Sequence, residues 1–137
     1  MTRALVEASG RGVRVVALLP GVIDNNVVRQ ASRSKFGELL EAGIEIYEFQ
    51  GSRLHAKTMV VDGAWASIGS ANLDRRSVAF NREANLNIFN EEFAGEMEKV
   101  FEKDLERSKR VVLEEWVKRP FHEKFAERIY GIFRPQY

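Results

Sequence analysis

Two apolar segments that flank an amphipathic one constrain the fold of this chain more than any other feature of its sequence. Residues 13–19 form a near-continuous apolar run, typical of a buried parallel strand, and Pro20-Gly21 ends it. The apolar positions within residues 25–41 follow a helical period, and Gly43 predicts the end of that helix. Residues 44–49 predict a second strand. A strand, a helix and a strand in this order indicate a right-handed α/β crossover.

The rest of the chain adds a short helix at residues 4–9 and further elements after the crossover. Residues 83–89 alternate between polar and apolar side chains, which predicts a strand with one polar face. An apolar stripe predicts a helix over residues 92–110, with an ion pair between Glu106 and Arg110. A chain of 137 residues, 45% of them hydrophobic, can build one core. The expected fold class is α/β, with a mixed sheet flanked by helices.

The segment between the crossover and residues 83–89 gathers polar side chains at a spacing that suggests a site. Residues 55–62 are expected to be mostly strand, so His55 and Lys57, two positions apart, would project from the same face. Asp62 and the glycine that follows it predict a tight hairpin turn. The returning strand ends at a glycine, after which Ser70 and Asn72 emerge.

Together these side chains describe a site for a phosphoryl group. His55 is the candidate nucleophile, because a neutral imidazole can attack phosphorus without first losing a hydroxyl proton. Lys57 provides a positive charge for phosphate oxygens, and Ser70 and Asn72 provide hydrogen-bond donors where negative charge builds in the transition state. Glu83 is expected to hold the second nitrogen of His55 and to set its tautomer. This chemistry needs no metal and no other cofactor.

Other polar residues near the motif and in the tail are interpreted separately from these groups. Asp62 completes the spacing His-x-Lys-x-x-x-x-Asp and is counted with the candidate catalytic residues, but its position at the turn indicates a structural role. Arg75, Arg76 and Arg82 either bind a second phosphate or form a solvated cluster of charges. His122 lacks any partner pattern and is expected on the surface.

The motif at residues 55–62 and the sequence after it resemble the phospholipase D superfamily. Residues 68–77 read Ile-Gly-Ser-Ala-Asn-Leu-Asp-Arg-Arg-Ser, and residues 81–86 read Asn-Arg-Glu-Ala-Asn-Leu. These runs look most like the C-terminal half of bacterial cardiolipin synthases. The likeness extends from Arg11 to Trp116 and so covers nearly all of the chain.

The resemblance implies one phospholipase D-type half-domain, which we place at residues 1–110, followed by a helical and aromatic extension at residues 111–137. The superfamily has a strand before the first helix of each half, whereas this chain opens on a helix, so the half-domain is expected to lack its first strand. The aromatic extension either lies on a membrane surface or packs against the missing half.

The resemblance also implies the reaction. A cardiolipin synthase-type phosphatidyltransferase would move a phosphatidyl group from one phospholipid to His55, and then to a glycerol hydroxyl of another. The proton for the leaving alcohol would come from a second histidine on a second motif. This chain carries one motif, so we interpret it as half of an enzyme. Its partner would be a second half, in the same parent chain or in a homodimer.

Composition limits the partners and the location. Lysine and arginine number 21 against 20 acidic residues, and the net charge of +1 argues against nucleic acid as a partner. There is no cysteine, which excludes disulfides and thiolate metal sites. No apolar run is long enough to span a bilayer. With a phospholipid substrate, the expected location is peripheral, at the cytoplasmic face of the bacterial membrane.

Two other functions remain open on the sequence. The first is a homodimeric phospholipase D-type phosphodiesterase or endonuclease, in which two copies of His55 meet across a twofold axis as nucleophile and acid. The second is an inactive truncated fragment, for which the missing second motif argues.

Overall fold

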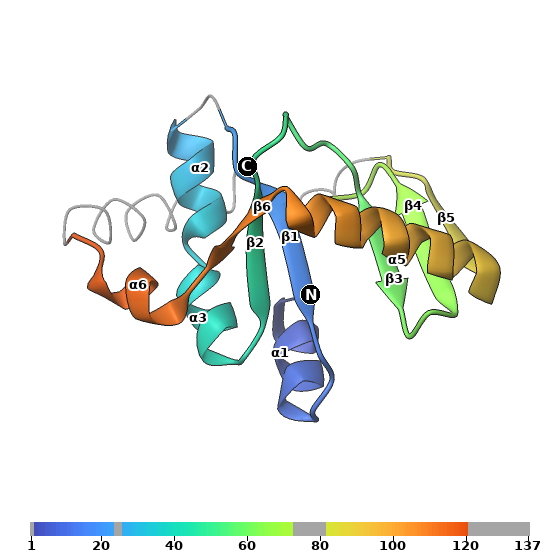
Figure 1. The fold of residues 1–137 in the computed structure, drawn as a ribbon, viewed down its shortest axis with the longest axis horizontal. Coiled ribbons are helices and arrows are strands. Elements are labelled where there is room, and N and C mark those ends of the chain that lie inside the picture. Colours follow the sequence, from blue (N-terminus) through green and yellow to red (C-terminus); the bar gives the residue numbers. More distant parts are fainter. Residues whose placement is uncertain (1, 24–25, 73–81, 121–137) are drawn as a thin grey trace.

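The computed structural model describes residues 2–23, 26–72 and 82–120 of the chain (Figure 1). In chain order the elements are α1 (Thr2–Gly10), β1 (Val16–Pro20), α2 (Asn26–Arg33), α3 (Phe36–Glu41), β2 (Glu45–Phe49), β3 (Thr58–Val61), β4 (Trp65–Gly69), β5 (Asn85–Phe89), α5 (Glu91–Glu106), β6 (Ser108–Val111) and α6 (Leu113–Lys118).

The crossover predicted near the start of the chain is present. β1 and β2 pair in parallel, with Val16 opposite Glu45, and α2 and α3 connect them. β6 pairs antiparallel with the other edge of β2, so the first sheet has the order β1-β2-β6. The helix between the strands ends as its sequence predicts: Gly43 has a φ of 80°, and the N–H of Ile44 donates to the carbonyl oxygen of Leu39 at 3.0 Å.

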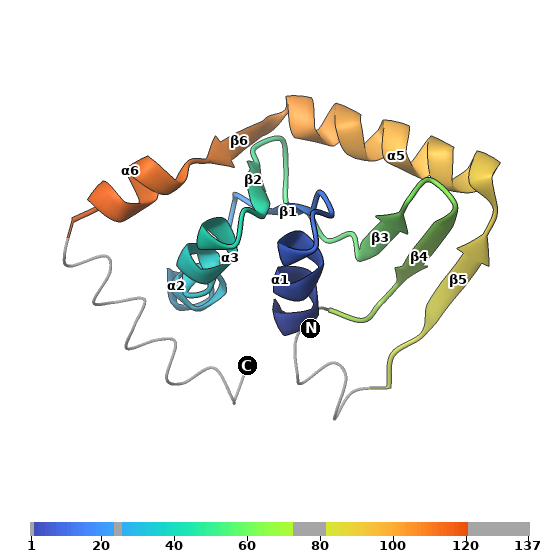
Figure 2. The same ribbon diagram turned by 90° about the horizontal axis from the view of Figure 1, so that it is seen from below.

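The second sheet is antiparallel, with the order β3-β4-β5. Helix α5 runs across both sheets and connects β5 of the second to β6 of the first (Figure 2). Its N-cap is Asn90, whose side chain accepts a hydrogen bond from the N–H of Phe93 at 2.8 Å. The mixed α/β class is therefore confirmed, with the strands divided between two three-stranded sheets.

The main core lies on the face of the first sheet opposite α5. Phe36, Ile44, Ile46 and Trp116 are its buried residues, and partly buried side chains from α1, β1, α3 and β6 pack around them. A single cluster thus buries apolar side chains of α1, β1, α3, β2, β6 and α6 together.

Trp116 attaches helix α6 to this core. Its ring lies 5.2 Å from the ring of Phe36, centroid to centroid, and only 8% of the residue is exposed. The guanidinium carbons of Arg33 and Arg119 lie 5.2 Å and 3.0 Å from its ring centroid. Arg33 also donates from Nε to the carboxylate of Glu48 on β2 at 2.9 Å. One tryptophan therefore holds α6 to α3 and to the end of α2.

The helix predicted over residues 25–41 is two helices, with a break at Ser34-Lys35. The break lets the two flanking side chains point to different partners. Arg33, at the end of α2, reaches Glu48, while Phe36, at the start of α3, is 2% exposed in the core. Helical periodicity was continuous across this point because both halves are amphipathic.

The helix predicted over residues 92–110 is wrong at its C-terminal end, where the structure has a strand. α5 ends at Glu106, and the next residues form β6 on the free edge of β2. Arg110 consequently points to Glu45, at 3.7 Å between its Nη2 and the carboxylate, and not to Glu106 as predicted. Backbone hydrogen bonds to β2 stabilise these residues as a strand, although their local sequence favours a helix. The local sequence pattern does not reveal such bonds, so the prediction missed the strand.

Candidate functional site

The predicted tight turn joins β3 to β4. Asp62 and Gly63 have φ angles of 52° and 61°, both in the left-handed region, as a type I′ turn requires. The N–H of Ala64 donates to the carbonyl oxygen of Val61 at 3.1 Å. This turn sets the register of the hairpin, so it decides which residues meet at the hairpin's open end.

His55 and Lys57 lie just before β3, so the prediction that both lie on the strand is wrong. β3 begins at Thr58. The ladder continues one residue further, because the N–H of Gly69 donates to the carbonyl oxygen of Lys57 at 3.1 Å. Beyond Gly69 the chain pairs with Ala84 instead, through the N–H of Ser70.

A hydrogen bond nevertheless joins the two motif residues. The ammonium of Lys57 donates to the carbonyl oxygen of His55 at 2.9 Å, which holds the two residues together. His55 is exposed to solvent and Lys57 is half-buried. The imidazole is therefore accessible to a substrate, while the lysine is held by the hairpin.

Ser70 and Asn72 follow β4 directly, as predicted. The N–H of Ser70 donates to the carbonyl oxygen of Ala84 at 3.1 Å, and its hydroxyl oxygen accepts from the N–H of Ala84, also at 3.1 Å. The N–H of Ala71 donates to Oδ1 of Asn85 at 3.2 Å. We call these three hydrogen bonds the clasp. It attaches the segment with the two candidate phosphate ligands to the start of β5.

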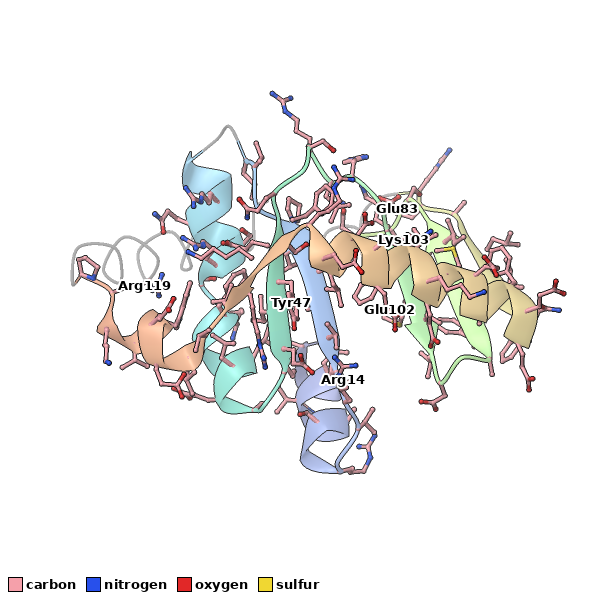
Figure 3. All side chains as sticks on the ribbon, viewed as in Figure 1. Arg14, Tyr47, Glu83, Glu102, Lys103 and Arg119 are labelled. Atoms are coloured by element: carbon pink, nitrogen blue, oxygen red, sulfur yellow. The ribbon has the colours of Figure 1, made fainter. Side chains whose placement is uncertain are left out.

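Glu83 precedes β5, whereas the strand was predicted to begin with it. The residue is half-buried and is followed directly by Ala84, the partner of Ser70. Figure 3 shows it beside the second sheet, well away from Arg119, the residue after α6. Its contact with His55 stays a prediction.

The predicted apolar face of β5 is only partly covered. Its Leu86 is 64% exposed. Phe89, which the alternation places on the opposite face, is 85% exposed, with its ring 6.5 Å from that of Trp65. β5 is an edge strand of its sheet, so it receives less cover than the central strand β4.

Five of the six candidate site residues thus flank one end of the second sheet or the loop that enters it. Asp62 is the sixth, and it lies at the other end of β3. A side chain built at Gly63 would lie 3.7 Å from the carboxylate of Glu98 on α5, so the turn is on the side of that helix. We keep for Asp62 the structural role proposed from its place in the turn.

An ion pair with a shifted pKa lies away from this site, between Glu45 and the exposed Arg14. The pKa of Glu45 is lowered, mainly by the hydrogen bond from Nε of Arg14 at 2.7 Å, with a further bond from the hydroxyl of Tyr47. Tyr47 lies on β2 of the first sheet and Arg14 just before β1, both apart from Glu83 (Figure 3). The pair sits at the start of β2, while the loop to His55 leaves from the end of that strand. It therefore stabilises the sheet and does not serve the site.

Several sequence predictions fall outside the described residues: Arg75, Arg76, Asn81, His122 and the tail beyond residue 120. Arg82 is described and is exposed. Within the part of the chain that the structure describes, no cluster of three or more His, Asp or Glu side chains is arranged to hold a metal ion. In the same part, every helix is too short or too polar to cross a membrane.

The sequence does not single out Asn85, although the structure places it in the clasp. A weak signal existed: it lies on the predicted polar face of residues 83–89, and asparagine side chains often bond to nearby backbone groups. The backbone partner, however, is 14 residues away in sequence. A local pattern does not show such a partner.

Two glycine substitutions should move stability in opposite directions. A Cβ at Gly69 would collide with the side chain of Asn85 and the carbonyl oxygen of Ala84, so Gly69→Ala must displace backbone and should cost about 1–3 kcal/mol. A Cβ at Gly95, inside α5, meets nothing within 4 Å, so Gly95→Ala should stabilise by about 0.5–1 kcal/mol. Chemical denaturation of both variants measures this. Equal effects would contradict the packing described for Gly69.

The arrangement at the end of the second sheet suits phosphate chemistry. An exposed imidazole, an ammonium, a hydroxyl and a primary amide come from two adjacent segments, and backbone hydrogen bonds hold those segments in place. Donors that are held in place before a reaction can stabilise developing charge without reorganising.

The chain is similar to proteins of known family. A family model described as cardiolipin synthase, PLD-like domain, matches residues 1–105. Cardiolipin synthase A of Erwinia tasmaniensis is 39% identical over 135 residues, which are 98% of this chain and 28% of that protein. Cardiolipin synthase A of Wigglesworthia glossinidia brevipalpis is 41% identical over 132 residues, 96% of this chain and 27% of its own. The chain thus spans little more than a quarter of the length of these relatives.

A solved structure has the same fold. The crystal structure of a phospholipase D family member, Nuc from Salmonella typhimurium, matches with a TM-score of 0.65 at 19% identity, over 81% of this chain and 72% of that one. The family model and the relatives agree with this fold. The chain belongs to the family of phospholipase D-like domains that occurs in cardiolipin synthases.

Proposed function

We propose that the chain is the catalytic half-domain of a cardiolipin synthase-type phosphatidyltransferase. The observation that carries the proposal is the pairing at the end of the second sheet. The bond from Gly69 to Lys57 and the bonds between Ser70 and Ala84 bring three stretches of the motif to one edge. Cardiolipin synthase A relatives at about 40% identity support a phospholipid as the substrate.

In this proposal His55 is the covalent carrier. Its imidazole attacks the phosphorus of a phosphatidylglycerol, the P–N bond forms, and the P–O bond to glycerol breaks, so that glycerol leaves with a proton. A terminal hydroxyl of a second phosphatidylglycerol then attacks the phosphorus of the phosphohistidine, the P–N bond breaks, and the hydroxyl proton passes to the group that protonated the leaving glycerol. The product is diphosphatidylglycerol, and His55 is regenerated. Lys57, Ser70 and Asn72 stabilise the negative charge on the phosphoryl oxygens in both steps.

Two further parts of the machinery are proposed. Glu83 orients the imidazole of His55 through its second nitrogen, as an acid does in catalytic triads. A second motif, in the same parent chain or in a homodimer mate, protonates the leaving glycerol. With this substrate the protein acts at a membrane surface, which we propose to be the cytoplasmic face.

The domain boundary is also a proposal. We assign residues 1–110 to the catalytic half-domain and residues 111–137 to an extension. β6 pairs with β2 up to Val111, and α6 packs through Trp116, so the beginning of the extension is joined to the core of the half-domain.

A lipid donor with a good leaving group tests the function without requiring the second motif. p-Nitrophenolate leaves without a proton at neutral pH, so phosphatidyl-p-nitrophenol in phosphatidylglycerol vesicles should react with the 137-residue chain alone. We expect release of p-nitrophenolate and a phosphatidyl adduct in the intact-protein mass, followed by slower formation of diphosphatidylglycerol, in which the attacking hydroxyl loses its proton to water.

Two comparisons decide between the alternatives. We expect thymidine 5′-p-nitrophenyl phosphate to be a poor donor. If this nucleotide reacts and the lipid does not, and if the mass in solution is that of a dimer, the protein is a nuclease-type phosphodiesterase. If neither donor reacts, the chain is an inactive fragment. Phosphatidic acid in place of diphosphatidylglycerol would show that water is the acceptor.

A further inference from the structure

We propose that Asn85 is a positioning residue for the phosphate-binding segment, residues 69–72. The inference rests on the proposed function, because that function is what gives the segment its role. Oδ1 of Asn85 accepts the N–H of Ala71 at 3.2 Å. Ala71 stands between Ser70 and Asn72, so a bond that holds its peptide plane also orients both neighbouring side chains.

The geometry around Asn85 is specific to its side chain. Gly69 lies directly against the carboxamide: a Cβ at that position would collide with Oδ1 of Asn85. Because Gly69 has no side chain, the carboxamide of Asn85 can lie across the end of β4. Gly69 and Asn85 are also opposite each other in the register of β4 and β5, which fixes their approach.

Asn85 supplies the one side-chain acceptor in the clasp that comes from β5. The other two bonds join Ser70 to the backbone of Ala84, and they constrain only the beginning of the segment. These residues are exposed or half-exposed, at the end of the central strand β4 and the start of the edge strand β5, so water competes for the N–H of Ala71 once Oδ1 is removed. Without it, the part of the segment that carries Asn72 gains freedom.

Removing the Asn85 side chain should misorient the donors in the transition state and leave substrate binding largely unchanged. Donors stabilise a transition state only when they point to the place where charge develops. Asn85→Ala should therefore lower kcat by about 10- to 100-fold, as small misplacements of reacting groups do, while KM changes little. Asn85→Asp keeps an oxygen that can accept the N–H of Ala71, but it adds a negative charge near the phosphate. It should recover most of kcat and raise KM, more so at low salt.

The chain contains a matched control. Asn87 is two residues further along β5, so it lies on the same face, and it is exposed like Asn85. It pairs in register with Ser67, inside the strand β4 rather than at its end. Asn87→Ala should leave both kcat and KM unchanged.

The experiment compares the three variants and His55→Asn in the p-nitrophenolate assay, and measures hydrogen exchange of the Ala71 amide by NMR. The expected result is faster exchange of this amide in Asn85→Ala, slow exchange in Asn85→Asp and Asn87→Ala, and the kcat and KM pattern above. Wild-type kcat in Asn85→Ala, with His55→Asn inactive, would overturn the role of Asn85 and leave the proposed function standing. Unchanged Ala71 exchange in Asn85→Ala would also overturn it. Activity retained in His55→Asn would instead refute the proposed function, and with it the inference.

Discussion

His55→Asn should lose at least about 10³-fold of the rate at which the chain releases p-nitrophenolate from phosphatidyl-p-nitrophenol, because the substitution removes the proposed nucleophile. The phosphatidyl adduct should disappear from the intact-protein mass spectrum at the same time. His55 is exposed and lies outside the strands, so the fold should be unaffected. The measurement is the initial rate, together with the mass of the protein quenched during turnover.

The chain's second histidine is the control for this variant. The sequence has two histidines, and His122 lacks any partner pattern, so His122→Asn should react at the wild-type rate. If the adduct persists in His55→Asn and vanishes in His122→Asn, the nucleophile has been misassigned. Circular dichroism of both variants excludes unfolding as the cause of lost activity.

Trp116→Ala should produce the largest loss of stability, about 3–5 kcal/mol, because it removes a large buried aromatic side chain and leaves a cavity. The ring packs on Phe36 in the core, and the guanidinium groups of Arg33 and Arg119 lie over it. All three contacts are lost together. Thermal and chemical denaturation of the variant measure the effect.

The neighbouring residue provides the comparison. Val117 is on the same helix but 57% exposed, so Val117→Ala should change stability by no more than about 0.5 kcal/mol. Trp116→Phe keeps a ring next to Phe36 and should fall between the two variants. A Trp116→Ala protein as stable as wild type would show that α6 is not part of the folded core, and that the extension is separate from the half-domain.

Features with a local cause were predicted from the sequence. The turn at Asp62 and Gly63 follows from two residues that tolerate positive φ, and the helix end at Gly43 has the same origin. The parallel pairing of β1 with β2 follows from the order of an apolar strand, a helix and another strand. The motif likewise determined the family, because its residues are contiguous and chemically distinctive.

Features with a distant cause were not predicted. β6 exists because the edge of β2 offers it a ladder, and β3 begins at Thr58 because its partner strand ends at Gly69. The local sequence favoured a helix at residues 108–111 and a strand at His55 and Lys57. In both places, hydrogen bonds to a strand remote in sequence decided where the strand begins.

The sequence by itself determined the family of this protein and the local turns and helix ends, and it supplied the proposal of which side chains attack, bind and orient a phosphoryl group. Only the tertiary structure decided which of those side chains share one end of a sheet, that Asp62 lies at the other end, and that Asn85 holds the segment between Ser70 and Asn72. The physical reason is that these relations consist of hydrogen bonds between segments far apart in the chain. Such bonds become visible only after the backbone has folded.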